Sequence, residues 1–135
     1  MRYITLEELA KAHDALLKKY GGSSGVRDHG LLESAIHRPQ STVFGNDAYP
    51  TLFDKAAAIS HSLLFNHPFV DGNKRTAFAA CHLTLLSNGW NLSSPVEETY
   101  SFLIDVITSH KDWPEISAWL KKNSKKSDRS ANPKP

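Results

Sequence analysis

Apolar residues recur every three or four positions along most of the chain, which is the period of an amphipathic helix. The first such stripe follows a capping-box pattern, Thr5 to Glu8, and stops at the paired glycines Gly21 and Gly22. Further stripes predict helices over residues 31–37, 51–66 and 73–87, behind a second capping box at Ser94, and after Asp112. No period-two pattern runs beyond a few residues, so we expect an all-α fold.

Two of these helices are expected to lie at the centre of a compact, single-domain bundle of about six helices. The faces of 51–66 and 73–87 are rich in small and apolar residues, which suits close packing against several neighbours. Pro68 and the turn pair at Asp71 end the first helix and open the second. A short polar loop is therefore predicted before the second central helix, and residues 40–50, which show no periodicity, are predicted to form another loop.

Composition narrows the class of protein further. The chain has 135 residues, of which 40% are hydrophobic and 22% charged, as in ordinary globular domains. A lone cysteine, Cys81, can form neither an internal disulfide nor a cysteine-rich metal site. The longest apolar runs fall well short of the roughly 18 residues that span a bilayer, and no targeting motif is visible. We expect a cytoplasmic protein without a membrane partner.

Charge is distributed unevenly along the chain. Residues 1–120 hold 10 basic and 13 acidic side chains, a net −3, whereas residues 121–135 hold six basic and one acidic, a net +5. We therefore predict a domain over 1–120 and a basic, disordered tail over 121–135. The tail leaves weak attraction to nucleic acid open, but the acidic body lacks the basic excess of a nucleic-acid-binding domain, so we do not expect a nucleic-acid partner.

The stretch from residue 67 to residue 75 combines groups that can handle a phosphate. The start of a helix offers unpaired N–H groups, Gly72 permits close approach, and Lys74 and Arg75 add positive charge. Asp71 can hold Mg²⁺, and His67 can accept a proton near neutral pH. On the residues alone, an ordinary pair of turns beside a solvated helix end stays open as the other interpretation.

The same stretch, His67-Pro-Phe-Val-Asp-Gly-Asn-Lys-Arg75 followed by Thr76 and Ala77, resembles the signature of the Fic/Doc superfamily. The lysine at its eighth place is similar to the Doc (death-on-curing) branch, as are the flanks 25–40 and 49–58. The resemblance covers nearly all of the predicted domain. It implies the Fic/Doc helical fold, with a catalytic loop before a central helix.

The resemblance also implies a role for each residue of the loop. His67 is the general base for a hydroxyl of the target protein, and the Asp71 carboxylate holds Mg²⁺ on the phosphates of ATP. The phosphate contacts are assigned to Gly72 and Asn73, through backbone N–H groups and the Asn73 amide, and to Lys74 and Arg75, through their charges. Phe69 is implied to be a buried anchor.

Two departures within the superfamily bear on the group transferred. Most AMP-transferring members have glycine in place of Lys74 and a second arginine in place of Phe78. Doc-type proteins share the pattern of this chain and resemble kinases that move the γ-phosphate of ATP to a threonine of elongation factor Tu. Because Gly72 stands where the phage-type Doc has alanine, AMP transfer stays open, as does an idle module that only holds a nucleotide or partner.

A toxin of a toxin–antitoxin pair, which arrests translation, is the role that the resemblance implies. No inhibitory segment of the kind carried by many Fic proteins is visible, since the nearest, Ser93 to Glu97, is followed by Glu98. We therefore expect a separate antitoxin whose disordered part folds onto the toxin. Outside the loop, histidines such as His13 are expected to be structural, and Arg27 or Arg38 is a possible contact to phosphate or to the protein substrate.

Overall fold

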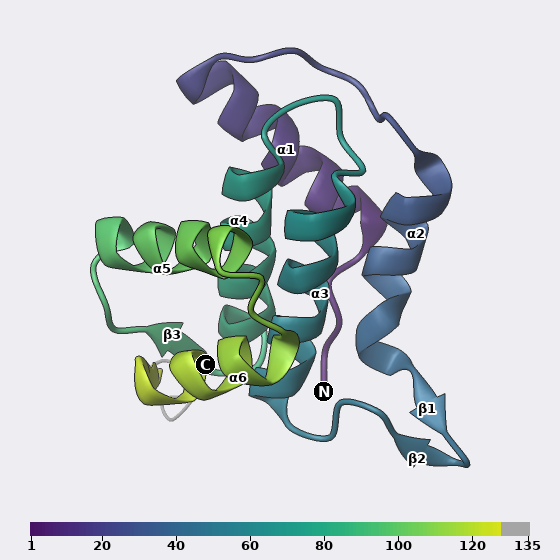
Figure 1. Ribbon diagram of the computed structural model, residues 1–135, viewed down its shortest axis with the longest axis vertical. Coiled ribbons are helices and arrows are strands. Elements are labelled where there is room, and N and C mark those ends of the chain that lie inside the picture. The colour runs from purple at the N-terminus through teal and green to yellow at the C-terminus, as the bar shows by residue number, and fades with distance from the viewer. Residues whose placement is uncertain (128–135) are drawn as a thin grey trace, which may run out of the picture.

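The computed structural model describes residues 1–127, and within them six α-helices form the body of the molecule (Figure 1). The helices are α1 (Leu6–Tyr20), α2 (His29–His37), α3 (Leu52–Asn66), α4 (Asn73–Leu86), α5 (Val96–Thr108) and α6 (Trp113–Lys122). A 3₁₀ turn, η1 (Arg38–Gln40), follows α2. The strands are short and pair two by two: β1 (Thr42–Val43) with β2 (Asn46–Asp47), and β3 (Trp90–Leu92) with β4 (Ser124–Lys126). The all-α prediction is confirmed.

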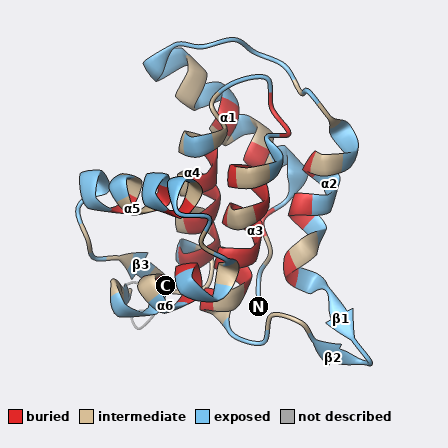
Figure 2. Ribbon diagram, in the orientation of Figure 1, coloured by how far each residue is buried: buried red, intermediate tan, exposed pale blue. Residues whose placement is uncertain are grey.

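Helices α3 and α4 form the centre, joined by the loop 67–72 at one end of the molecule (Figure 1). α3 packs against α4, α2 and α6, while α4 also contacts α1 and α5. The buried positions concentrate on these two helices (Figure 2). Three consecutive alanines of α3, Ala56–Ala58, are fully buried, and their small side chains let neighbouring helices approach closely on several sides.

Most of the predicted helix starts are confirmed, and one is wrong. Thr5 and Thr51 each close a capping box, as does Asp112 at the start of α6. The box predicted at Ser94 does not form, because α5 begins one residue later with Pro95 as its N-cap and no side-chain cap. The Ser94 hydroxyl instead lies 2.7 Å from the hydroxyl of Thr99.

Residues 40–50 are not the structureless loop that the sequence predicted. The strands β1 and β2 pair in register, with Val43 opposite Asn46, around a two-residue turn of Phe44 and Gly45. Both turn residues have positive φ, 52° and 81°, as hairpin turns of this length require. Strands of two residues are too short to leave a period-two pattern in the sequence.

The predicted boundary at residue 120 is also displaced. α6 continues to Lys122, and β4 then pairs antiparallel with β3, bringing Lys126 opposite Trp90. The part of the predicted tail that the structure describes is thus regular structure, and residues 128–135 lie outside the described residues. None of the helices in the described part of the chain combines the length and the apolar character needed to cross a bilayer.

Candidate active site

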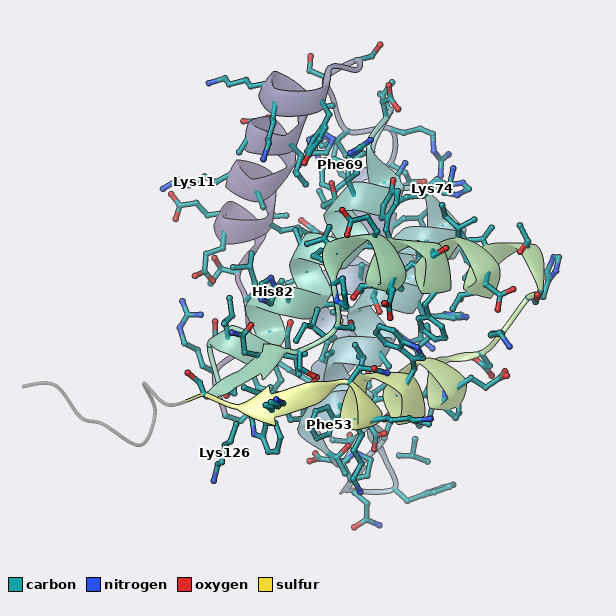
Figure 3. All side chains as sticks on the ribbon, turned by 90° about the vertical axis from the view of Figure 1, so that its left-hand side faces the viewer. Lys11, Phe53, Phe69, Lys74, His82 and Lys126 are labelled. Carbon is teal, nitrogen blue, oxygen red and sulfur yellow. The ribbon has the colours of Figure 1, made fainter. Side chains whose placement is uncertain are left out.

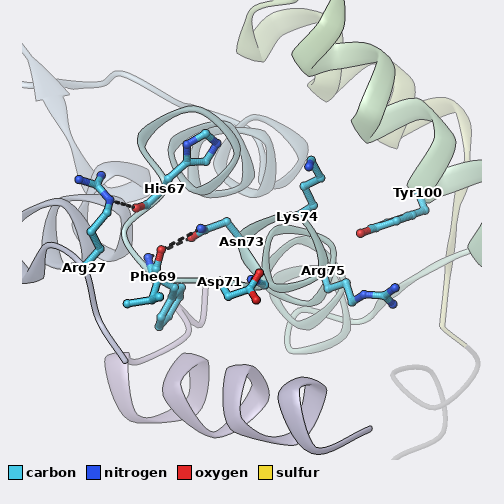
Figure 4. A pocket seen from close by; sticks show the side chains of 10 residues that line it. Arg27, His67, Phe69, Asp71, Asn73, Lys74, Arg75 and Tyr100 are labelled. Carbon is cyan, nitrogen blue, oxygen red and sulfur yellow. Dashed lines mark hydrogen bonds between the residues drawn. The ribbon is translucent and has the colours of Figure 1, made fainter. Parts of the chain in front are cut away.

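All six residues that the sequence assigned to the site line one pocket at the junction of α3 and α4 (Figure 4). It has a volume of about 460 Å³, a size common for small-molecule sites. The wall consists of Arg27 from the segment before α2, of residues 67 and 69–75, and of Tyr100 from α5. The fold therefore brings the predicted general base, the predicted metal-binding carboxylate and both cations to a single cavity.

His67 leaves α3 in a left-handed conformation, with φ 48° and ψ 60°. Pro68 disfavours a helical conformation at the residue before it, which ends α3 at Asn66 as predicted. Arg27 holds this turn, because its Nε donates to the carbonyl of His67 at 2.7 Å and its Nη2 to that of Asn66 at 2.6 Å. These carbonyls belong to the helix end, where no intrahelical donor is available. Arg27 thus fixes the backbone from which the exposed imidazole projects.

The segment before α2 also pairs with the loop through its backbone. Arg27 N–H donates to the Pro68 carbonyl at 2.7 Å, and Val70 N–H donates to the Gly25 carbonyl at 3.0 Å. Val26 forms an isolated antiparallel bridge with Phe69. The first half of the loop is therefore held like a strand at a sheet edge, although its sequence reads as a turn.

Asn73 locks the other half of the loop. Its Oδ1 accepts from the N–H of Phe69, and its Nδ2 donates to the carbonyl of the same residue, both at 3.0 Å. Phe69 itself is 2% exposed, in keeping with its expected role as an anchor. The side-chain amide that is expected to reach a phosphate oxygen thus also closes the loop, and its Nδ2 retains a second N–H.

The amino end of α4 supplies the anion-binding groups. Gly72 is the N-cap with φ 78°, a conformation that glycine adopts without strain, and α4 has no side-chain cap. Within residues 1–127, the backbone N–H groups of Asn73, Lys74 and Arg75 make no hydrogen bond. Unpaired amides and the positive end of the helix dipole together favour an anion at this position.

Asp71 is the one carboxylate that the described part of the pocket contains. Its Oδ2 accepts from the N–H of Ser23 at 3.1 Å, and its Oδ1 from the N–H of Gly72 at 2.8 Å. These two bonds, the Ser23 bond most strongly, hold the pKa of the Asp71 carboxyl below its ordinary value, so it is ionised at neutral pH. Within residues 1–127 no cluster of three metal-ligating side chains occurs. The ionised Asp71 carboxylate is an oxygen ligand of the kind that Mg²⁺ takes together with nucleotide phosphates and water.

The two cations of the pocket are held differently. Lys74 is exposed at the mouth, whereas the Arg75 guanidinium lies 3.9 Å from the ring centre of Tyr20 and 5.5 Å from that of Tyr100. Stacking on aromatic faces leaves the N–H groups at the edge of a guanidinium available for phosphate. Neither tyrosine was singled out by the sequence, since each also fits an ordinary helix stripe.

His13 supports the loop from below and was missed as a site residue. Its ring stacks on Phe69 at 3.8 Å with an interplanar angle of 11°, and its Nε2 lies 2.8 Å from the carbonyl oxygen of Asp71. Because a carbonyl only accepts, Nε2 carries the proton. His13 is 3% exposed. A buried histidine on an amphipathic helix gives no sequence signal for such a contact.

Three further residues lie away from the pocket. Arg38, one of the two candidate contacts, donates to the Tyr49 hydroxyl at 2.7 Å and to Ser62 Oγ at 3.0 Å and does not line the pocket. Phe78, at the place of the second arginine of AMP-transferring proteins, packs against the hydrophobic core. Cys81 is buried, which raises the pKa of its thiol to about 12 and excludes a thiolate nucleophile at neutral pH.

Comparison with known proteins agrees with this geometry. A model of the Fic/DOC family matches residues 3–85. Toxin Doc of Mycolicibacterium smegmatis (strain ATCC 700084 / mc(2)155) is 48% identical over 103 residues, covering 75% of this chain and 79% of that protein. Protein kinase doc of Escherichia phage P1 is 39% identical over 89 residues, covering 66% and 70%. The chain belongs to the Fic/DOC family and, within it, is similar to Doc toxins.

Proposed function

We propose that this protein is a Doc-type toxin that uses Mg²⁺ and ATP to phosphorylate a hydroxyl of a host protein. One observation carries the proposal: an exposed imidazole, His67, shares a pocket with the unpaired amides of α4 and with two cations. These are the groups needed to position a phosphoryl group and to stabilise its charge during transfer. A threonine of elongation factor Tu is the proposed acceptor, which would explain arrest of translation.

His67 accepts the proton of the attacking hydroxyl. The hydroxyl oxygen forms a bond to the γ-phosphorus, the bond from that phosphorus to the bridging oxygen breaks, and ADP leaves. A neutral imidazole nitrogen carries the lone pair that such a base needs. Arg27 keeps the imidazole at the mouth by fixing both backbone carbonyls of the turn that carries it.

The phosphates bind at the amino end of α4. The amides of Asn73, Lys74 and Arg75 donate to phosphate oxygens, and the side chains of Lys74 and Arg75 add positive charge. Asp71 holds Mg²⁺, which supplies charge neutralisation on the phosphates. Asn73 keeps these donors in place by closing the loop on Phe69.

Transfer of AMP is the second candidate function. It is favoured by Gly72, which keeps the glycine of AMP-transferring proteins at the N-cap of α4. Against it, the described pocket holds no arginine beyond Arg27 and Arg75, and the residue at the place of the second arginine is Phe78, which packs against the core. A clamp for a second phosphate group is thus missing at that place, which favours phosphoryl transfer.

Isotope-labelled ATP separates the candidate functions. The protein is incubated with a translation extract and with ATP labelled at either the α- or the γ-phosphate. We expect label from the γ-position on a protein the size of elongation factor Tu, and mass spectrometry should place it on a threonine. Label from the α-position would establish AMP transfer instead, and absence of both labels would leave the idle-module interpretation.

An antitoxin is the second proposed partner. The proposal rests on the similarity to Doc toxins, and its binding segment would be a disordered chain that folds onto the toxin surface. We expect the product of the neighbouring open reading frame to co-purify with this protein and to relieve growth arrest on co-expression. Absence of a complex by pull-down and sedimentation would count against this part of the proposal.

A further inference from the structure

The glycine-rich segment between α1 and α2 lies directly against the Asp71 carboxylate. Ser23 donates its backbone N–H to Asp71 Oδ2 at 3.1 Å. Beside it, Gly22 has φ +123°, and a Cβ built on it would lie 2.9 Å from the same Oδ2 and 3.0 Å from Cδ2 of Leu17. A Cβ practically never comes that close to another heavy atom, so the carboxylate occupies space that any other residue at position 22 would fill.

Asp71 is thus oriented from two directions. The amide of Gly72 fixes Oδ1 and the amide of Ser23 fixes Oδ2, while the missing side chain of Gly22 leaves the space that Oδ2 occupies. Each carboxylate oxygen retains a second lone pair for a metal ion. His13 holds the backbone of Asp71 through its carbonyl, which leaves the side-chain rotation as the freedom that this glycine segment controls.

We propose that Gly22 and the backbone N–H of Ser23 are positioning groups that set the Asp71 carboxylate for Mg²⁺–ATP. The inference rests on the proposed function and adds a specific metal-orienting role for the segment between α1 and α2. A side chain at position 22 would overlap Oδ2 of Asp71. The Asp71 side chain can rotate to relieve this overlap, and the rotation turns its carboxylate away from the phosphates. Partners of a metal ligand that fix its orientation typically change metal affinity 10- to 100-fold when altered.

Binding of Mn²⁺ in place of Mg²⁺, followed by electron paramagnetic resonance with ATP present, measures this role without turnover. For Gly22→Ala we expect affinity for Mn²⁺–ATP to fall about tenfold. The matched control is Gly21→Ala: Gly21 also has positive φ, +85°, but no described atom lies within 4 Å of its Cβ position. Ser23→Ala, which keeps the donating N–H, should bind like the wild type.

The Mg²⁺ dependence of the transfer rate gives a second test, because a purely structural role of Gly22 would not change the Mg²⁺ requirement. In the γ-phosphate assay, Gly22→Ala should need about tenfold more Mg²⁺ for half-maximal rate and should recover most of its kcat at saturating Mg²⁺. Gly21→Ala should keep the wild-type Mg²⁺ requirement. Equal losses in both variants would mean that backbone strain, not the carboxylate contact, causes the effect, and would overturn the proposal.

A nuclear magnetic resonance measurement avoids dependence on the folding of Gly22→Ala. The Ser23 amide proton of the wild type should change its chemical shift when Mg²⁺–ATP is added. The same resonance should differ between the wild type and Asp71→Asn, whereas the Ser24 resonance should change much less in both comparisons. An unchanged Ser23 resonance in Asp71→Asn would refute the proposed contact. If the wild type binds no Mn²⁺–ATP, the proposed function fails; if wild type and Gly22→Ala bind it equally, only this inference fails.

Discussion

The amino ends of the two central helices differ in how their backbone is satisfied. At α3, Thr51 accepts from the N–H of Asp54 at 3.0 Å and Asp54 accepts from the N–H of Thr51 at 3.2 Å. At α4, Gly72 is the N-cap without a side-chain bond, and the backbone N–H groups of residues 73–75 stay unpaired within the described chain. The capped end stabilises the fold, whereas the uncapped end is left free for a ligand.

The cations near the two ends follow the same division. Around the α3 start, Lys55 is 5% exposed, donates to the Pro39 carbonyl and lies 3.6 Å from Asp47. At the other end of the bundle Lys74 is exposed, well apart from Phe53 at the α3 start (Figure 3). The lysine near the α3 start is therefore paired and buried, whereas the lysine at the α4 start, in the proposed active site, is exposed.

The largest effect is expected from removing the imidazole at the uncapped end. His67→Ala should lower the rate of γ-phosphate transfer about 10²- to 10⁴-fold, because the general base is lost. It should also abolish growth arrest on induction, while circular dichroism stays unchanged because the side chain is exposed. His29→Ala, an exposed histidine outside the pocket, is the control. Equal toxicity of His67→Ala and the wild type would contradict the assigned chemistry.

A smaller effect, on both activity and stability, is expected at the loop clamp. Asn73→Ala leaves the N–H and carbonyl of Phe69 without their partners, which should cost about 1–3 kcal/mol in the free energy of unfolding. Misplacement of the loop should lower transfer about 100-fold. Urea unfolding and the γ-phosphate assay measure the two effects, with the exposed Asn91→Ala for comparison. A variant with full activity would show that the clamp does not position the site.

The capped end should affect stability alone. Thr51→Ala removes the side-chain acceptor at the α3 start and should lower the free energy of unfolding by about 1 kcal/mol. Activity per folded molecule should stay within about twofold of the wild type, because the substitution lies at the far end of α3 from the pocket. Loss of activity without loss of stability would erase the distinction between the two ends.

The smallest effect is expected from pH at His61, in the second half of α3. Burial, and then the nearby Arg38, lowers the pKa of His61, while Asp112 opposes the shift. The unfolded chain therefore binds more protons at His61 than the folded protein does. The contribution of His61 to the free energy of unfolding is therefore fully present above the ordinary histidine pKa of about 6.5. It is lost as the pH falls from that value through the lowered pKa of the folded protein. His61→Gln should flatten this part of the unfolding free-energy profile, and an unchanged slope would assign it to other groups.

The sequence by itself determined the elements and the chemistry of the loop. Periodicity and the caps at Thr5, Thr51 and Asp112 were readable because they depend on residues three or four apart. The loop residues from His67 to Arg75 were readable because they are contiguous. The hairpin of β1 and β2 was not readable, because strands of two residues leave no period-two pattern. The end of the domain was not readable either, because β4 pairs with β3 more than 30 residues earlier in the chain.

Only the tertiary structure decided how the loop is held. Arg27, His13 and Gly22 reach the loop from segments 40 or more residues away in sequence, and no local pattern encodes such contacts. It also decided that the side-chain amide of Asn73 binds the backbone of Phe69, four residues earlier in the chain. The physical reason is that the sequence specifies which groups the loop carries, whereas the orientation of those groups depends on packing between distant segments.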